Sequence, residues 1–249
     1  MKVTRHIRLE IAANSLASAV AAQEGGADRI ELCDNLEAGG TTPSYGTIAA
    51  ARDVLKLPLF VLVRPRAGDF LYDSRERDVM LRDIELCRKL GCDGVVIGAL
   101  DADGDVDVVF SREMVAAAGA MHTTFHRAFD AVRDPSRALE TIITLGCAQV
   151  LTSGGYASAP EGALAIAGHV ETARGRLLVM AGAGITPGNV APLVGVTGVE
   201  DVHASARAVR TTAMRFHNQR LAGLDHDWQQ TDRATVRALR DALDGCVSR

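Results

Sequence analysis

Short apolar runs recur along this chain about every 20 to 35 residues, and most of them end at a polar or charged residue. Segments with helical spacing separate the runs. Eight strand–helix units of this size favour a closed (β/α)8 barrel. The expected strands cover Leu9 to Ala12, Ala27 to Leu32, Leu59 to Val63, Gly94 to Ile97, Met121 to Phe125, Ala148 to Leu151, Leu177 to Met180 and Val199 to Val202.

The chain length of 249 residues suits one barrel of this kind. We expect a single domain over residues 1–249, because no linker rich in Pro, Ser or charge interrupts the pattern. The main alternative is a doubly wound open sheet, which needs a G-x-G-x-x-G turn after an early strand. Gly182-Ala183-Gly184 comes too late for that turn and lacks its third glycine.

The ends of some helices are also visible in the sequence. Ser15 and Ser44 precede segments with helical spacing, and both are good N-cap residues. A final helix is expected from Thr231 to Leu243. The sequence does not specify the segment from Arg207 to Asp227, which is compatible with a long loop that contains a short helix.

The charge balance excludes several kinds of partner. A formal net charge of -4, from 27 basic and 31 acidic residues, gives no electrostatic case for nucleic acid. No apolar run approaches the roughly 18 residues of a membrane span, and residues 1–8 have no apolar stretch typical of a signal peptide. The five cysteines form no CxxC pair, which indicates free thiols and an intracellular protein.

Charged side chains gather at the expected strand ends, which meet at one mouth of a barrel. The guanidinium group of arginine fits carboxylate or phosphate, so the set predicts a site for a small anionic or polyhydroxylated ligand. The alternative is a network of internal ion pairs, because buried charges need partners. The set consists of Glu10, Glu31, Arg64, Arg66, Asp69, Asp101, His126 and Arg127.

His126 directly follows an apolar run and has Asp130 four residues further on. Because imidazole can transfer protons near neutral pH or bind a metal, we predict Glu31 and His126 as the acid–base groups. Asp130 and Glu10 are further catalytic candidates. A carboxylate, either Glu31 or Asp130, could fix the tautomer of the imidazole. The alternative is a core histidine bonded to a backbone carbonyl.

Glycine-rich turns follow the last strands of the expected barrel. In many barrels the loops after strands seven and eight bind phosphate through backbone N–H groups, and glycine permits the close approach. We therefore predict that Gly182, Gly184 and Ser205 cradle a phosphate. Ser153 and His203, also at strand ends, are further candidate ligand-binding residues. The alternative is that these glycines simply turn the chain.

Cys33 lies at the mouth end of the second expected strand. Cys92 and Cys147 precede strands four and six, so they belong at the opposite end of the barrel. A strand of five or six residues spans about 17 to 20 Å, and these thiols therefore cannot share one metal ion with Cys33. A soft-metal site at Cys33 would need His or Met ligands, or a second chain. The alternative is a small buried apolar residue.

Six motifs occur in an order that resembles the CutC family, which is named for copper homeostasis. The resemblance covers nearly the whole chain. The motifs are Asp28 to Cys33, Gly39 to Ser44, Arg64 to Phe70, Thr124 to Asp130, Leu151 to Gly155 and Met180 to Gly184.

The resemblance implies a barrel fold, a cytoplasmic location, a homo-oligomer and a role in copper homeostasis in which thiols bind Cu(I). In this chain that role falls on Cys33 as the metal ligand, helped by His126, His203 or a partner chain. The alternative function is an enzyme that acts on a small anionic, sugar-like or phosphorylated molecule at the barrel mouth.

Overall fold

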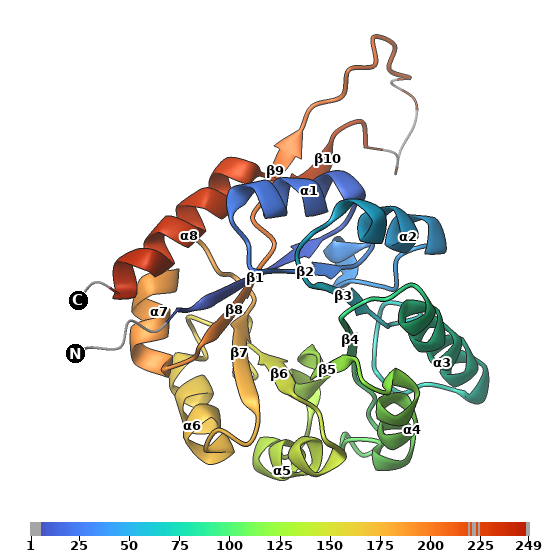
Figure 1. Ribbon diagram of the computed structural model, residues 1–249, viewed down its shortest axis with the longest axis vertical. Coiled ribbons are helices and arrows are strands. Elements are labelled where there is room, and N and C mark those ends of the chain that lie inside the picture. The colour runs from blue at the N-terminus through green and yellow to red at the C-terminus, as the bar shows by residue number, and fades with distance from the viewer. Residues whose placement is uncertain (1–5, 219, 221–222, 224, 248–249) are drawn as a thin grey trace.

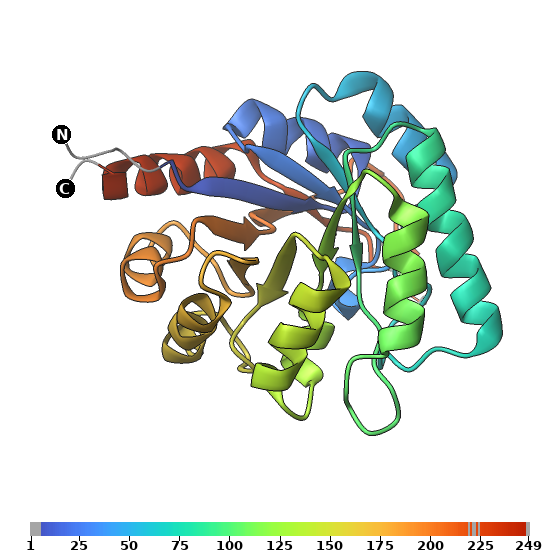
Figure 2. The same cartoon turned by 60° about the horizontal axis from the view of Figure 1, so that its bottom comes forward.

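The computed structural model describes residues 6–218, 220, 223 and 225–247. Eight parallel strands close into a barrel in chain order, from β1 to β8, and helices surround it (Figure 1). A view turned by 60° shows the same helices outside the strands (Figure 2). The predicted (β/α)8 barrel is confirmed, whereas a single domain over residues 1–249 stays a prediction.

Each barrel strand begins and ends within two residues of the apolar run that predicted it. The barrel strands are β1 Arg8–Ala13, β2 Arg29–Leu32, β3 Leu59–Leu62, β4 Gly94–Ile97, β5 His122–Phe125, β6 Gln149–Thr152, β7 Leu178–Gly182 and β8 Asp201–Ala204. The helices are α1 Leu16–Gly25, α2 Tyr45–Val54, α3 Ser74–Lys89, α4 Val108–Ala118, α5 Pro135–Leu145, α6 Ala163–Ala173, α7 Val190–Thr197 and α8 Arg233–Val247. Two short 3-10 helices, η1 Leu36–Ala38 and η2 Arg127–Ala131, follow β2 and β5.

The predicted caps are present. The Ser15 hydroxyl accepts a hydrogen bond from the Ser18 amide at the start of α1, and Ser44 does the same for Thr47 in α2. No helix in the described part of the chain is long and apolar enough to cross a membrane.

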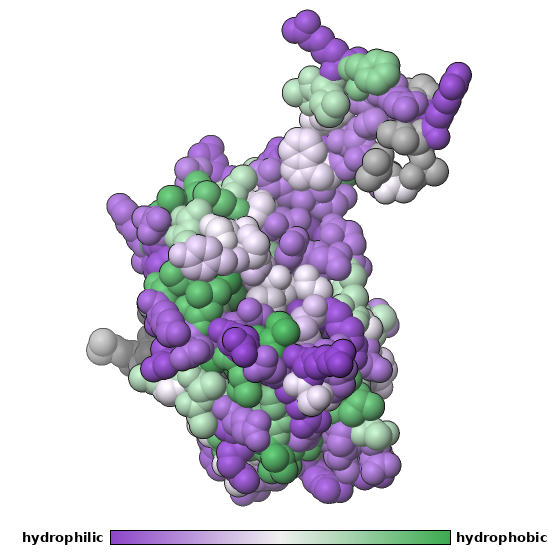
Figure 3. All heavy atoms as spheres, turned by 90° about the vertical axis from the view of Figure 1, so that its right-hand side faces the viewer, coloured by the Kyte–Doolittle hydropathy of each residue, from purple (hydrophilic) through white to green (hydrophobic). Residues whose placement is uncertain are grey.

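The segment after β8 differs from the expectation. The described residues of 207–227 contain no helix, and a strand, β9 Arg207–Arg210, pairs antiparallel with β10 Trp228–Thr231. Residues 219, 221–222 and 224 lie outside the described residues. Thr231 belongs to this hairpin and not to the final helix, because its amide donates to Ser18 at the buried start of α1. The hairpin arm stands away from the barrel (Figures 1 and 3).

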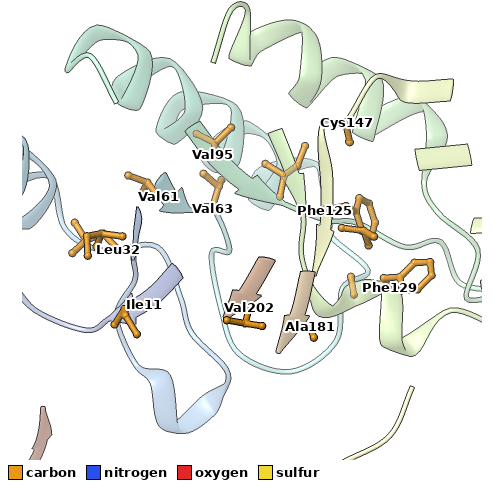
Figure 4. Close-up of a cluster of buried hydrophobic side chains, with 14 of the residues drawn as sticks. Ile11, Leu32, Val61, Val63, Val95, Phe125, Phe129, Cys147, Ala181 and Val202 are labelled. Carbon is orange, nitrogen blue, oxygen red and sulfur yellow. The ribbon is translucent and has the colours of Figure 1, made fainter. Parts of the chain in front are cut away.

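The main apolar core lies between the strands and the helices. Ile11, Leu32, Val61, Val95 and Val202 come from different strands and gather in this layer (Figure 4). Because side chains alternate along a strand, their neighbours point into the barrel. The inward face therefore carries the polar groups described below.

We predict that Phe110→Ala lowers the free energy of unfolding by about 3–5 kcal/mol, because Phe110 on α4 is fully buried and its loss leaves a cavity. Val109→Ala on the same helix is the control. Val109 is 66% exposed, so its loss should change the value by no more than about 0.5 kcal/mol. Urea unfolding followed by circular dichroism measures both, and equal effects would contradict the assigned helix face.

Candidate functional site

A cavity of about 710 Å³ lies at the mouth formed by the carboxyl ends of the strands. Eight of the fourteen predicted site residues line it: Glu31, Arg64, His126, Arg127, Asp130, Gly184, His203 and Ser205. Six do not line it: Glu10, Cys33, Arg66, Asp69, Ser153 and Gly182.

The register of the barrel places Glu10 at the centre of a buried charge network. On β1 it pairs with Arg29 of β2 on one side and with His203 of β8 on the other. The Arg29 guanidinium donates to one Glu10 oxygen, and His203 Nδ1 lies 2.7 Å from the other. Burial raises the pKa of Glu10, but the charges and hydrogen bonds of Arg29 and His203 outweigh burial and lower the pKa to about 2. Glu10 is therefore a buried carboxylate beneath the cavity.

Arg29 was not among the predicted site residues, yet it connects several strands. It donates to Gln149 Oε1 at 2.8 Å on β6 and lies 3.8 Å from Asp201 on β8. Its guanidinium also stacks over the Phe60 ring at 4.5 Å. A sequence signal was available, because Arg29 stands two residues before Glu31 and so points to the same face.

Glu31 is the group whose environment favours the neutral form. Burial raises its pKa to about 7, and the Glu10 carboxylate contributes to the rise, although the positive charge of His203 opposes it. Its Oε2 atom is buried and has no hydrogen-bond partner among the described residues. The nearest cationic atom is His203 Nδ1, at 4.0 Å. A carboxyl group in this state can give or take a proton near neutral pH.

His203 lines the cavity, and its surroundings favour the protonated form. Burial lowers the pKa of its imidazole, but the Glu31 and Glu10 carboxyl groups outweigh burial and raise it. The Glu10 carboxylate contacts Nδ1, and 13% of the His203 side chain is exposed. The histidine is thus fixed by a carboxylate, an arrangement that sets the orientation of an imidazole.

His126 has the opposite character. Burial lowers its pKa to about 3, and the Arg64 charge adds to the effect. The Ala128 amide donates to Nδ1 at 3.1 Å, so the ring proton of the neutral imidazole is on Nε2. That atom is buried and has no hydrogen-bond partner in the described part of the chain. The prediction that Glu31 or Asp130 fixes the tautomer is wrong, because the chain turns into η2 directly after His126 and brings the Ala128 amide against the ring.

Arg64 binds the loops that form one side of the cavity. Its guanidinium donates to the carbonyl oxygens of Ala38, Gly40 and Gly68. It also stacks on Phe70 at 5.0 Å, and Phe70 in turn packs against His126 at 5.1 Å. Most of its donors are therefore used within the protein, which favours a positioning role over direct binding of an anion.

Asp130 and Ser153 are hydrogen-bonded to each other where β5 and β6 end. Asp130 accepts from Arg127 Nε at 2.7 Å and from the amide and hydroxyl of Ser153 at 3.0 Å. Ser153 is fully buried. Arg66 and Asp69 pair with each other at 2.9 Å on the outer part of the β3–α3 loop. The sequence predicts both residues at the mouth because they follow a strand, but the loop places them outside the cavity lining.

Cys33 lies against the barrel interior rather than in the cavity. It packs with Ala12, Phe60 and Leu62, and its thiol donates to the Ala13 carbonyl at 3.6 Å. Burial raises its pKa, and Glu31 and Asp34 raise it further. A thiolate is therefore unfavourable here. The metal assignment to Cys33 stays a prediction, and these contacts weigh against it.

Within the described part of the chain, three possible metal ligands cluster together. One ligand atom each from Glu10, Glu31 and His203 lies within 4.8 Å of the others. This oxygen and nitrogen set suits hard or borderline cations rather than Cu(I), which prefers sulfur. Arg29 already neutralises Glu10, and its charge opposes a second cation at this position.

The phosphate cradle predicted after β7 and β8 stays a prediction. Gly184 and Ser205 line the cavity, whereas Gly182 lies in β7 against Leu151 and His203. Sequence reasoning did not select Tyr156 and Arg207, which also line the cavity.

No lysine is among the described residues that line the cavity. The chain has three lysines. Lys56 and Lys89 precede β3 and β4, at the opposite end of the barrel, and Lys2 lies outside the described residues. The described cavity wall therefore offers no amine for a Schiff base.

The protein is thus a (β/α)8 barrel with ionisable side chains around a cavity at the mouth. The CutC family model matches residues 7–208. A CutC family protein of Chromobacterium violaceum is 55% identical over 241 residues, which cover 95% of this chain and 98% of that protein. A CutC family protein of Xanthomonas axonopodis pv. citri is 52% identical over 235 residues, which cover 94% of this chain and 98% of that protein.

Solved structures agree with this assignment. A CutC protein of Streptococcus agalactiae is 32% identical with a TM-score of 0.77. The match covers 80% of this chain and 98% of the Streptococcus agalactiae chain. Thiamine phosphate pyrophosphorylase from Pyrococcus furiosus, 16% identical with a TM-score of 0.61 over 98% of each chain, shares the fold alone. The chain belongs to the CutC family.

We predict that His126 stays neutral, with its proton on Nε2, from about pH 5 to 8, because burial and Arg64 hold its pKa near 3. Imidazole ¹⁵N spectra, assigned with His126→Gln, measure the tautomer directly. His203 is the internal comparison and should be protonated in the lower part of this range. A midpoint near 6.5 for His126 would contradict the account.

Proposed function

We propose that this protein is an enzyme that moves a proton within a small anionic, sugar-like or phosphorylated molecule bound at the barrel mouth. The observation that carries the proposal is Glu31, a cavity-lining carboxyl group with a pKa of about 7 whose buried Oε2 atom accepts no hydrogen bond from the described residues. A general base performs best when its pKa lies near the working pH.

The residues around Glu31 suit proton abstraction beside a carbonyl group. Glu31 takes the proton from carbon, the C–H electron pair becomes the C=C bond of an enolate, and the π pair of the carbonyl moves to its oxygen. The Nε2–H of neutral His126 donates a hydrogen bond to that oxygen, as a preorganised electrophile. Glu31 then returns the proton to a carbon of the enolate, where the C=C pair forms the new C–H bond and the oxygen pair re-forms a carbonyl. In this role His126 donates a hydrogen bond and does not act as the predicted acid–base group, because a pKa of about 3 keeps its ring neutral.

Two guanidinium groups on the cavity wall support an anionic substrate. Arg127 is 43% exposed and Arg207 is 28% exposed, and each pairs with one carboxylate. Guanidinium groups bind carboxylate and phosphate through parallel N–H donors. His203 lies on the same wall, and its raised pKa favours the positively charged form there.

A second candidate is the binding of Cu(I) as cargo, which membership of a family named for copper homeostasis supports. Soft thiolates are the ligands that Cu(I) prefers. At the mouth the candidate ligand is Cys33, whose burial makes the thiolate costly. A cytoplasmic homo-oligomer belongs to the same proposal.

The enzyme proposal is tested by solvent deuterium uptake. Small hydroxy-ketones, hydroxy acids and sugar phosphates are incubated in D₂O with the protein, and ¹H NMR and mass spectrometry follow exchange at carbon. We expect at least one class to exchange, at a rate that rises as pH increases through about 7, because Glu31 must be ionised to act as a base.

Glu31→Gln should lower that rate by roughly 10²- to 10⁴-fold. Glu85→Gln on α3, a half-exposed carboxylate that pairs with Lys89, is the matched control and should exchange like the wild type. Uptake that is equal in Glu31→Gln and the wild type, or absent for every class, would contradict the proposal.

A further inference from the structure

Two arginines reach the cavity from different sides of the barrel mouth. Arg127 begins η2 after β5, and Arg207 begins β9 after β8. Both residues line the cavity. The strands that lead to them are three places apart in the closed ring of eight, and the strand ends of such a barrel surround its mouth. The two guanidinium groups are therefore separate points for an anion and do not form a single clamp.

Each of these guanidinium groups is fixed by the protein and keeps donors for a ligand. Arg127 Nε donates to Asp130 at 2.7 Å and Nη2 donates to Ser153 at 2.8 Å, whereas Nη1 donates to none of the described residues. Arg207 uses Nη1 on Glu37 at 2.9 Å, and its Nε and Nη2 donate to no described residue. A preorganised guanidinium group loses less side-chain entropy for each hydrogen bond that it forms.

The charge of the cavity lining favours a ligand with more than one negative charge. The described lining contains three arginines, with Arg64 as the third, and two carboxyl groups, Glu31 and Asp130. Burial raises the pKa of Glu31 to about 7, so this group is only partly ionised near neutral pH. The lining is thus positive, although the whole chain has a formal net charge of -4. A cavity lined by one sign of charge attracts ligands of the other sign.

We propose that the cavity binds a molecule with an anionic group at each end, a carboxylate or a phosphate, with one end on Arg127 and the other on Arg207. The inference rests on the proposed enzyme function and narrows its substrate to a doubly anionic class. Between its ends the molecule crosses the mouth, where Glu31 and His126 also line the cavity. The volume of about 710 Å³ accommodates a chain of about three to six carbons.

The test is isothermal titration calorimetry of the full chain with matched probes. The two-ended probes are 3-phosphoglycerate and 6-phosphogluconate, which carry a carboxylate at one end and a phosphate at the other. Glycerate and gluconate lack the phosphate, whereas glycerol 3-phosphate and glucitol 6-phosphate lack the carboxylate. We expect at least one two-ended probe to bind on the order of 10- to 100-fold more tightly than either of its one-ended analogues, because each end adds charge-assisted hydrogen bonds.

Arg127→Gln and Arg207→Gln separate the two ends. Each variant should weaken binding of the two-ended probe on the order of 10-fold or more. Each should also weaken one of the one-ended analogues, and the affected analogue should differ between the two variants. Arg176→Gln removes the same charge and is the matched control, because Arg176 pairs with Glu140 at 2.6 Å outside the cavity lining. It should bind every probe like the wild type.

Two results would overturn the inference. One is that no two-ended probe binds the wild type more tightly than its one-ended analogues, a comparison that does not depend on the folding of any variant. The other is that folded Arg127→Gln and Arg207→Gln weaken the same analogue, or neither. In both cases the enzyme proposal stands if deuterium uptake depends on Glu31. Two-ended binding without any deuterium uptake removes the enzyme proposal and leaves the binding site.

Discussion

The hydrogen-bonded ion pair between Arg29 and Glu10 inside the barrel is the interaction on which the rest of the site depends. Glu10 can remain a carboxylate in the interior only because a guanidinium neutralises it there, since an unpaired buried charge costs several kcal/mol. The ionised Glu10 then orients His203 and helps to raise the pKa of its imidazole. Glu31 is buried beside this second carboxylate, and burial together with the Glu10 charge raises its pKa although His203 opposes the rise.

The two histidines at the mouth show how the same fold gives one residue type two states. His203 has carboxyl groups around it and gains a proton more easily, whereas His126 is buried near the Arg64 guanidinium and loses it. Pairs of titratable groups whose environments move their pKa values apart are typical of acid–base sites. Here the barrel register and the η2 turn produce that difference.

Sequence reasoning predicted the barrel because periodicity depends only on which residues are apolar. It also placed Glu31, His126 and His203 correctly at strand ends that meet, since parallel strands share one mouth. It placed Arg66 at the mouth as well, because a strand end does not reveal where the following loop goes. It passed over Arg29, whose strand position carries meaning only once Glu10 is known to be its neighbour.

The hairpin arm was missed for a related reason. It depends on a chain reversal that pairs β9 with β10 without a recognisable motif.

The central claim is that Glu31 holds its proton near neutral pH. Titration of the side-chain ¹³C carboxyl signal of Glu31, assigned by its loss in Glu31→Gln, measures this most directly. The account predicts a midpoint of about 7. A midpoint at or below the ordinary value of 4.5 would contradict it.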